Sequence, residues 1–369
     1  MNKYLICKEK NIAVLGRHTV TNDKVNLFWT ASGIEFNISA SELWVTFISD
    51  YNVSEPWISI EINGSVISRM MLTRGEHTVC IFRNMSAEGI KRIRILRDSQ
   101  AMAFDEKCIL QVVSVTHDGV IHKPESKTYK FEFIGDSITS GEGLFGASSD
   151  MDWTPMFMGA FNSYAVKTSD NFNAEFRVIS QSGWGIVSSW DNNPHNTIPG
   201  HYKQICAMIQ GKYSTMLGAS KTNNFLIWQP DVIVINLGSN DHGALEAPEW
   251  RDINTGEVFK QEADGVGKPT DRTVQNIKLA VEIFLSEIRL YNLKAHIIWA
   301  YGMIDRSYIP LLQKAVEIYK TKHKDNKVSF CRLSAMSNSS VGSRKHPGIL
   351  CHAKAAETLS HCIKEILKK

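Results

Sequence analysis

The pattern of hydrophobic residues changes once along this chain of 369 residues, close to residue 120, and this change constrains the fold more than any other feature. Before it, apolar and polar residues alternate in short segments, which is the pattern of half-buried β-strands. Asn63-Gly64 between two of these segments indicates a β-hairpin. Short strands at near-regular spacing predict a β-sandwich of the jelly-roll type over residues 1–122. The expected strands are 34–38, 43–48, 57–62, 77–82 and 90–96.

The second part of the chain has a different pattern, in which strands alternate with longer amphipathic segments. It follows a polar segment, residues 117–127, that we interpret as a linker. The alternation predicts a mainly parallel sheet covered by helices on both faces, an α/β domain over residues 123–369. The expected strands are 129–134, 175–180, 232–237, 295–301 and 328–333, and the expected helices lie near 161–171, 201–210, 273–291, 309–324 and 352–368. The polar segment 248–271 is predicted to be a long surface loop and a candidate cover for an active site.

The composition excludes several classes of function. Lys and Arg total 41 and Asp and Glu total 38, a formal net charge of +3, whereas a nucleic-acid surface needs clustered basic residues without matching acids. The basic run Lys91-Arg92-Ile93-Arg94 is interpreted as the solvated face of a strand. No segment approaches the roughly 20 apolar residues that span a bilayer. We therefore expect neither a nucleic-acid partner nor a membrane partner.

The cysteines bear on the cellular compartment. The seven cysteines are odd in number, scattered, and form no CxxC pair, so neither a disulfide framework nor a zinc knuckle is indicated. No secretion signal is recognised at the start of the sequence. Reduced thiols in a cytoplasmic protein are the simplest account.

The stretch Phe131–Gly143, FEFIGDSITSGEG, places a serine directly after a predicted strand. A hydroxyl in a tight turn between a buried strand and a helix is exposed and rigid, and many hydrolases hold their nucleophile there. Gly135 permits the turn, and Asp136 can accept hydrogen bonds from loop amides. Ser137 is therefore the candidate nucleophile, and an ordinary turn is the alternative.

Further polar residues follow other predicted strands. Gly183, in the segment Gln181–Gly185, and Asn240, in the segment Gly238–Asp241, are candidate hydrogen-bond donors to a developing oxyanion. Open α/β sheets place their ligands at the carboxyl ends of strands, where both residues are expected. His346, just before the last predicted helix, is the candidate base. His195, His201 and Asp191 fit no common metal-ligand spacing, so no metal is predicted.

Taken in order, Gly135-Asp136-Ser137-Ile138, Gly183, Gly238-Ser239-Asn240-Asp241 and His346 resemble the four sequence blocks of the SGNH (GDSL-type) hydrolases. A β-sandwich followed by FEFIGDSITSGEG, ISQSGWGI and IIWAYGM is similar to the two-domain acetyl esterases of carbohydrate esterase family 2, over nearly the whole chain. The resemblance implies a flavodoxin-like three-layer domain and ester hydrolysis without a metal or organic cofactor. It also implies that Ser137 is the nucleophile and His346 the base, and that the Ser137 N–H, the Gly183 N–H and the Asn240 amide form the oxyanion hole.

One position departs from the common SGNH pattern. Many members carry an aspartate three residues before the histidine, and here that position is Ser343. Some family 2 esterases are similar in this respect, and the resemblance implies a Ser–His dyad with a backbone carbonyl orienting the imidazole. Asp305 and Glu357 are the alternatives for a carboxylate in that role.

The resemblance implies a carbohydrate acetyl esterase acting on acetylated mannan, glucomannan or xylan, as polymers or oligosaccharides. Tryptophans stack on sugar rings, and Trp184 and Trp250 are the expected substrate contacts, with Trp153 and Trp190 as further candidates and core packing as the alternative. Other hypotheses are a lipase or thioesterase of longer acyl esters and a non-catalytic carbohydrate-binding protein. The regioselectivity, the sugar backbone and the oligomeric state do not follow from the sequence.

Overall fold

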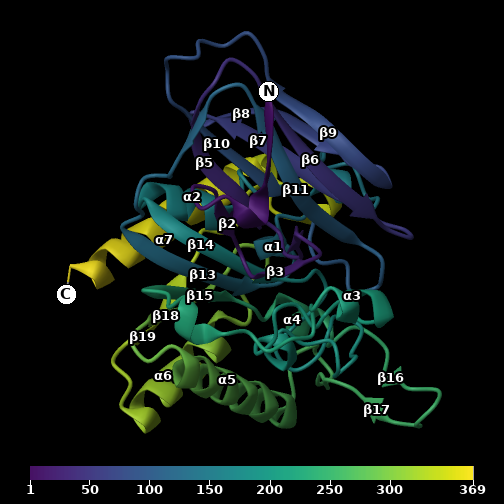
Figure 1. Cartoon of the computed structure of the whole chain (residues 1–369). Helices are drawn as coiled ribbons and strands as arrows, with labels where there is room; N and C mark the ends of the chain where they lie inside the picture. Colours follow the sequence, from purple (N-terminus) through teal and green to yellow (C-terminus); the bar gives the residue numbers. More distant parts are fainter. Residues whose placement is uncertain (369) are drawn as a thin grey trace.

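The computed structural model describes residues 1–368, which form two antiparallel sheets followed by a parallel sheet (Figure 1). In the first antiparallel sheet the strand order is β3-β4-β11-β6-β9, with β1 beside β11. In the second it is β12-β5-β10-β7-β8, with β2 beside β5. The strands are β1 (Asn2–Leu5), β2 (Ala13–Leu15), β3 (His18–Thr21), β4 (Lys24–Leu27), β5 (Gly33–Ser39), β6 (Leu43–Asp50), β7 (Trp57–Ile62), β8 (Ser65–Met71), β9 (Gly75–Phe82), β10 (Lys91–Arg97), β11 (Ile109–His117) and β12 (Val120–His122).

The two antiparallel sheets enclose one apolar core, to which strands of both sheets contribute buried side chains. Phe36 of β5, Phe47 of β6 and Ile95 of β10 are at most 2% exposed and belong to this core. The predicted hairpin at Asn63-Gly64 is present: both residues have positive φ (52° and 84°), as a two-residue turn between β7 and β8 requires. The five expected strands are therefore confirmed as β5, β6, β7, β9 and β10, and they belong to antiparallel sheets.

The parallel sheet has the strand order β14-β13-β15-β18-β19, the order of flavodoxin-like folds. Its strands are β13 (Tyr129–Gly135), β14 (Ala174–Ser180), β15 (Val232–Asn236), β18 (His296–Tyr301) and β19 (Val328–Arg332). All four residues of the run Val232–Ile235 are 0% exposed, as expected for a strand covered on both faces. An α/β domain with a parallel sheet is thus confirmed.

Helices cover both faces of this sheet (Figure 1). On one side lie α2 (Tyr164–Asn171) and α7 (Ile349–Leu367), and on the other α5 (Asp271–Tyr291) and α6 (Ile309–His323). The short helices α1 (Ser137–Ser140), α3 (Lys212–Met216) and α4 (Ser239–Gly243) follow the carboxyl ends of strands or connect loops. Among residues 1–368, no helix is both long and apolar enough to cross a membrane.

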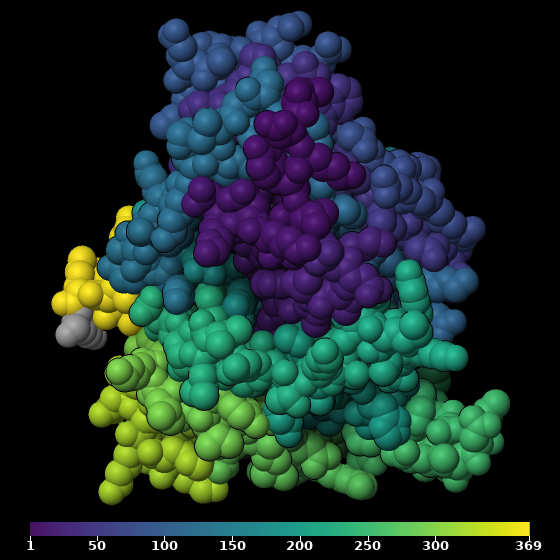
Figure 2. Space-filling model, viewed as in Figure 1, coloured from purple at the N-terminus to yellow at the C-terminus, as the bar shows by residue number. Residues whose placement is uncertain are grey.

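The N-terminal sheets are seated directly on the second part of the chain (Figure 2). Trp29 is fully buried in the core under one face of the parallel sheet, and its indole N–H donates to the carbonyl of Ile205 at 2.7 Å. Arg94 is 2% exposed and pairs with Glu61 and with Asp170 of α2, both at 2.7 Å. The prediction that the Lys91–Arg94 run is a solvated face is therefore wrong at Lys91, which is 4% exposed, and at Arg94, which joins the two parts of the chain.

Three other predictions are corrected by the structure. The expected linker 117–127 contains strand β12, whose backbone pairs with β5. No helix forms over 201–210, because the Ile205 and Cys206 N–H groups donate to Lys221 and Ala219 instead of to carbonyls one turn earlier. The segment 248–271 contains a small hairpin, β16 (Trp250–Arg251) with β17 (Val258–Phe259), and the first residue of α5.

Candidate active site

Ser137 is the first residue of α1, directly after the turn that ends β13. Asp136 caps this helix, with its Oδ1 accepting the Ile138 N–H at 3.0 Å. A Cβ on Gly135 would lie 2.0 Å from the Thr139 Oγ1, so only glycine allows this close approach. The turn therefore has the local structure predicted from the sequence, and it presents Ser137 to a cavity.

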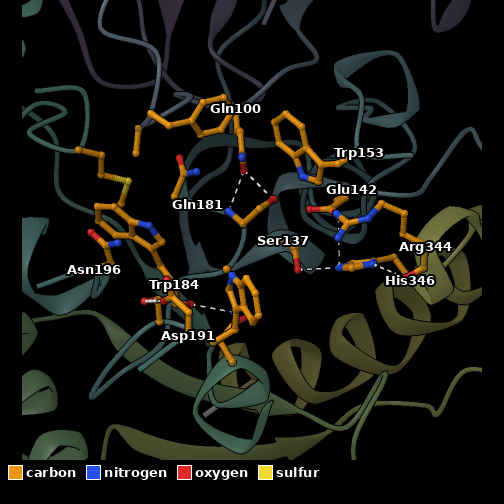
Figure 3. Close-up of a pocket in the computed structure, with 18 of the residues that line it drawn as sticks. Gln100, Ser137, Glu142, Trp153, Gln181, Trp184, Asp191, Asn196, Arg344 and His346 are labelled. Carbon is orange, nitrogen blue, oxygen red and sulfur yellow. Dashed lines mark hydrogen bonds and ion pairs between the residues drawn. The ribbon is translucent and has the colours of Figure 1, made fainter. Parts of the chain in front are cut away.

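His346 lies beside Ser137 although 209 positions separate them in the sequence (Figure 3). Its Nε2 is 2.9 Å from the Ser137 Oγ, and its Nδ1 is 3.0 Å from the backbone carbonyl of Arg344. A carbonyl only accepts, so Nδ1 carries the proton, and Nε2 of the neutral ring is free to accept the serine hydroxyl proton.

Neither alternative carboxylate contacts the imidazole. Asp305 accepts from Tyr301 and Ser307, and Glu357 lines a different cavity. The Ser343 Oγ is buried and has no hydrogen-bond partner within the described residues. The geometry is thus that of a pair of side chains oriented by a backbone carbonyl.

Glu142 and Arg344 are neighbours of this pair that the sequence interpretation missed (Figure 3). Glu142 is 4% exposed; its carboxylate pairs with the Arg344 guanidinium at 2.5 Å and lies 3.7 Å from the His346 Nε2. The ion pair fixes Arg344, whose φ is +52° and whose carbonyl orients the imidazole. Two features of the sequence could have indicated this ion pair: Glu142 lies five positions after the serine, in GEG, and Arg344 lies two positions before the histidine.

Gly183 and Asn240 follow β14 and β15, and both line the same cavity. Gly183 has φ +81°, a left-handed conformation that favours glycine. The Asn240 Nδ2 donates to the Trp184 carbonyl at 3.0 Å and lies 3.4 Å from the Asp136 Oδ2. The contact with Asp136 is the longer of the two, so a ligand oxygen would compete with Asp136 for that amide hydrogen.

Two buried acids support these loops. Burial raises the pKa of the Asp136 carboxyl to about 7, and the charges of Asp241 and Glu142 act in the same direction. Burial also raises the pKa of Asp241, whose carboxylate accepts the backbone N–H groups of Ile186 and Val187 at 2.8 Å. Asp241 therefore ties the loop that carries Gly183 to α4.

The cavity has a volume of about 640 Å³ and several aromatic residues in its lining. Ser137, Gly183, Asn240 and His346 line it together, so the structure brings these four predicted residues to one place. Trp153, Trp184 and Trp190 also line it, as do Gln100 and Phe104 of the N-terminal region.

Trp250 is not among the lining residues, and its ring packs against that of His195 at 5.4 Å. No residue of the 248–271 segment lines the cavity either, so the candidate cover lies elsewhere. Within residues 1–368, no group of three or more His, Cys, Asp or Glu is arranged to hold a metal ion.

The flavodoxin-like strand order, with Ser, Gly, Asn and His gathered at the carboxyl edge of the sheet, defines the SGNH class of α/β hydrolase folds. Residues 131–359 match the GDSL-like lipase/acylhydrolase family, and the chain belongs to this family.

Similar proteins narrow the assignment. The structure of an acetyl xylan esterase, Est2A, from the rumen bacterium Butyrivibrio proteoclasticus is 36% identical, with a TM-score of 0.97 and full coverage of both chains. The cellulase/esterase CelE of Acetivibrio thermocellus is 25% identical over 92% of this chain, which spans only 37% of the length of CelE. A family two carbohydrate esterase from Clostridium thermocellum, solved with cellohexaose, shares the fold at 24% identity, with a TM-score of 0.79 and coverage of 97% and 99%. The resemblance to carbohydrate esterase family 2 is confirmed.

Proposed function

We propose that this protein is a serine esterase that removes O-acetyl groups from plant-type polysaccharides or oligosaccharides. The observation that carries the proposal is the 2.9 Å contact between Ser137 Oγ and His346 Nε2 in a cavity that three tryptophans also line. A nucleophile and a base within hydrogen-bond reach, with the base oriented by a third group, are the requirements for nucleophilic acyl transfer. The Arg344 carbonyl supplies the third group.

In the proposed mechanism, the Ser137 Oγ attacks the acetyl carbonyl carbon while His346 Nε2 takes the hydroxyl proton. The tetrahedral oxyanion is stabilised by the Ser137 N–H, the Gly183 N–H and the Asn240 amide. His346 then gives the proton to the sugar oxygen, which leaves with the electron pair of the broken ester bond. Water, deprotonated by His346, attacks the acetyl-enzyme, releases acetate and restores Ser137. No step calls for a metal or organic cofactor.

The lining of the cavity favours a sugar ester over a long acyl chain. It combines indole rings with side chains that donate or accept hydrogen bonds, including Gln181, Asp191 and Asn196. Aromatic faces stack on sugar rings while polar groups bind hydroxyls. Among the proposed substrates, acetylated xylan comes first because Est2A is an acetyl xylan esterase; mannan and glucomannan come next.

Trp184 is proposed as a substrate contact, although it is only 7% exposed. Trp190, which is 58% exposed in the same lining, presents more of its ring to a ligand. Trp250 retains a proposed role only if a substrate chain extends beyond the cavity.

We also propose two domains, residues 1–122 and 123–369, with a jelly-roll topology in the first. The last strand of the antiparallel sheets ends at His122 and the first strand of the parallel sheet begins at Tyr129. From β5 to β7 and from β9 to β12 the chain passes between the two antiparallel sheets at each step, as in a jelly roll.

A cytoplasmic location is proposed from the thiols, since all seven cysteines are free. The Sγ atoms of Cys331 and Cys362 lie 2.7 Å apart. The test is to alkylate free thiols at cell lysis and then to determine the state of these two cysteines. A disulfide between them would contradict a location in a reducing compartment.

The test of function is acetate release from acetylated xylo- and manno-oligosaccharides by the native protein and by Ser137→Ala. Release by the native protein alone supports the proposal, and the preferred oligosaccharide identifies the sugar backbone. No release by either protein, with p-nitrophenyl butyrate or octanoate hydrolysed instead, would overturn it in favour of a lipase-type enzyme.

A further inference from the structure

Gln100, a residue of the N-terminal region, lies in the wall of the cavity that contains Ser137. It belongs to the loop between β10 and β11 and is fully buried. Its side-chain oxygen accepts two hydrogen bonds from one residue of the parallel-sheet domain: the Ser182 N–H at 2.8 Å and the Ser182 hydroxyl at 2.9 Å. Dashed lines from Gln100 mark both contacts (Figure 3).

The backbone of Gln100 is held rigidly. The buried Arg97 guanidinium donates to the carbonyls of Leu27, Ser99 and Gln100 at 2.7, 2.9 and 2.8 Å. A guanidinium with three fixed acceptors leaves the loop little conformational freedom.

The same loop is tied to the other domain by Asp98. Its Oδ1 accepts the Ala160 N–H at 2.9 Å, and its Oδ2 accepts from Arg69 at 2.7 Å. Arg69 in turn donates to the carbonyl of Met158 at 2.6 Å. Gln100 is therefore fixed with respect to the parallel sheet as well as to its own strands.

Ser182 immediately precedes Gly183, so the Gly183 N–H belongs to the peptide unit that joins them. The Gly183 carbonyl, which belongs to the next peptide unit, accepts the Trp190 N–H at 2.9 Å. Gly183 has φ +81°, a region in which glycine is otherwise free to move. The direction of its N–H is thus set by two anchors, Gln100 through Ser182 and the backbone of Trp190.

We propose that Gln100 is a positioning residue, which aims the Gly183 N–H at the oxyanion by holding Ser182. The inference rests on the proposed function, in which Gly183 is an oxyanion donor. Donors accelerate acyl transfer only when they are fixed before the reaction, because reorienting them during it takes back the stabilisation. The N-terminal β-sandwich is then part of the catalytic centre and not only a neighbouring module.

The test compares Gln100→Met, which keeps the size of the side chain and removes the acceptor, with Gln111→Met as a matched control. Gln111 is a buried glutamine of β11 that bonds Asn26 and does not line the cavity. For p-nitrophenyl acetate we expect Gln100→Met to lower kcat about tenfold with little change in KM, since misaligning a donor loses less than the roughly 10²–10³-fold of deleting one. Gln111→Met should leave both constants within about twofold of the native values.

Amide hydrogen exchange gives a second readout that does not depend on activity. In Gln100→Met the Ser182 amide should exchange about tenfold faster or more, while amides of β13 keep their native rates. Ser182→Ala, which loses only the hydroxyl contact, should have a smaller effect on kcat. The double variant should be no slower than Gln100→Met alone, because both changes break one contact.

The inference is overturned if Gln100→Met keeps its native kcat, if the exchange of the Ser182 amide is unchanged, or if Gln111→Met shows the same loss. A rise in KM alone would also overturn it, since that pattern belongs to a substrate contact. p-Nitrophenyl acetate carries no sugar, so a native protein active on this ester and inactive on acetylated oligosaccharides would contradict only the proposed substrate. A native protein inactive on every ester would overturn the proposed function and this role of Gln100 together.

Discussion

The cavity has two walls that are built in different ways. The sheet wall (Ser137, Gly183, Asn240 and His346) comes from loops that follow parallel strands and from the approach to α7. The loop wall (Gln100, Ala103 and Phe104) comes from one connection between two antiparallel sheets. Parallel strands bring residues distant in sequence to one edge, which supplies groups for chemistry. The antiparallel connection offers no nucleophile or base, and it contributes a fixed hydrogen-bond acceptor.

The comparison shows that the groups proposed to react and the group proposed to orient a hydrogen-bond donor come from different parts of the chain. The groups of the sheet wall are expected to decide whether the reaction occurs, and those of the loop wall how well its donors are aimed. Substitutions in the two walls should therefore differ in size and in kind.

The largest effect is expected in the sheet wall. Ser137→Ala or His346→Ala should lower kcat by about 10⁴-fold or more, and the double variant should be little worse than either, because the two residues act as a unit. Esterase rates measure this, with Ser140→Ala as control, since Ser140 bonds Ser180 and does not line the cavity. Appreciable turnover by Ser137→Ala would place the nucleophile elsewhere.

Asn240→Ala should follow with a loss of about 10²–10³-fold in kcat, the usual effect of deleting an oxyanion donor. Asn196→Ala is the matched control with p-nitrophenyl acetate, which carries no sugar, because Asn196 lines the same cavity and makes no side-chain contact with Ser137 or Asn240. Equal effects of the two substitutions on kcat would show that Asn240 contributes through the shape of the cavity and not as a donor.

Arg97 at the end of β10 supports the loop wall, and its loss is expected to lower stability first. Arg97→Met leaves three buried carbonyls without their donor and should lower the free energy of unfolding by about 3 kcal/mol or more. Arg74→Met is the control: its guanidinium also donates to two carbonyls, but it is 59% exposed, and the loss should stay below about 1 kcal/mol. Chemical denaturation measures both, and similar losses would mean that burial of Arg97 adds nothing.

The tryptophans should separate substrate binding from chemistry. Trp190→Ala should raise KM for an acetylated oligosaccharide by about five- to tenfold through lost stacking, and leave p-nitrophenyl acetate unaffected. Trp250→Ala should change neither, since Trp250 lies outside the lining. A rise in KM with Trp250→Ala would restore the sequence-based assignment of that residue.

A separate effect concerns the dependence of stability on pH. The pKa of Asp136 is about 7 in the folded protein against 3.8 for a free carboxyl, so between these values the folded state holds a proton that the unfolded state has lost. Its contribution to stability is therefore present at pH 4 and is lost as pH rises to 7. Asp136→Asn has no proton to lose, so its unfolding free energy relative to the native protein should increase over this window, by at most about 1.4 kcal/mol per pH unit. Parallel pH profiles of the two proteins would show that Asp136 ionises normally.

The sequence determined much of the sheet wall. A strand, a glycine and a serine in FEFIGDSITSGEG are local features, and the spacing of Gly183, Asn240 and His346 follows from where parallel strands end. The absence of an aspartate at Ser343 was also visible, and with it the expectation that a backbone carbonyl orients the imidazole, which the Arg344 carbonyl meets. Five of the twelve antiparallel strands (β5, β6, β7, β9 and β10), the Asn63-Gly64 turn and four of the five predicted helices were likewise predicted from local periodicity, whereas β1–β4, β8, β11 and β12 were missed.

Only the tertiary structure decided the contacts between the two parts of the chain. Hydrophobic periodicity carries no information about which distant group a buried residue contacts. It therefore could not predict the ion pair of Arg94 with Asp170, the backbone bond of Ile205 to Lys221, or the hydrogen bond between Ser182 and Gln100. The helix predicted at 201–210 does not form, because its backbone N–H groups bond carbonyls distant in the sequence. Trp250 lies outside the cavity, where its ring packs against that of His195. Local sequence sets which residues are available for chemistry, and packing between the two parts of the chain sets how they are held.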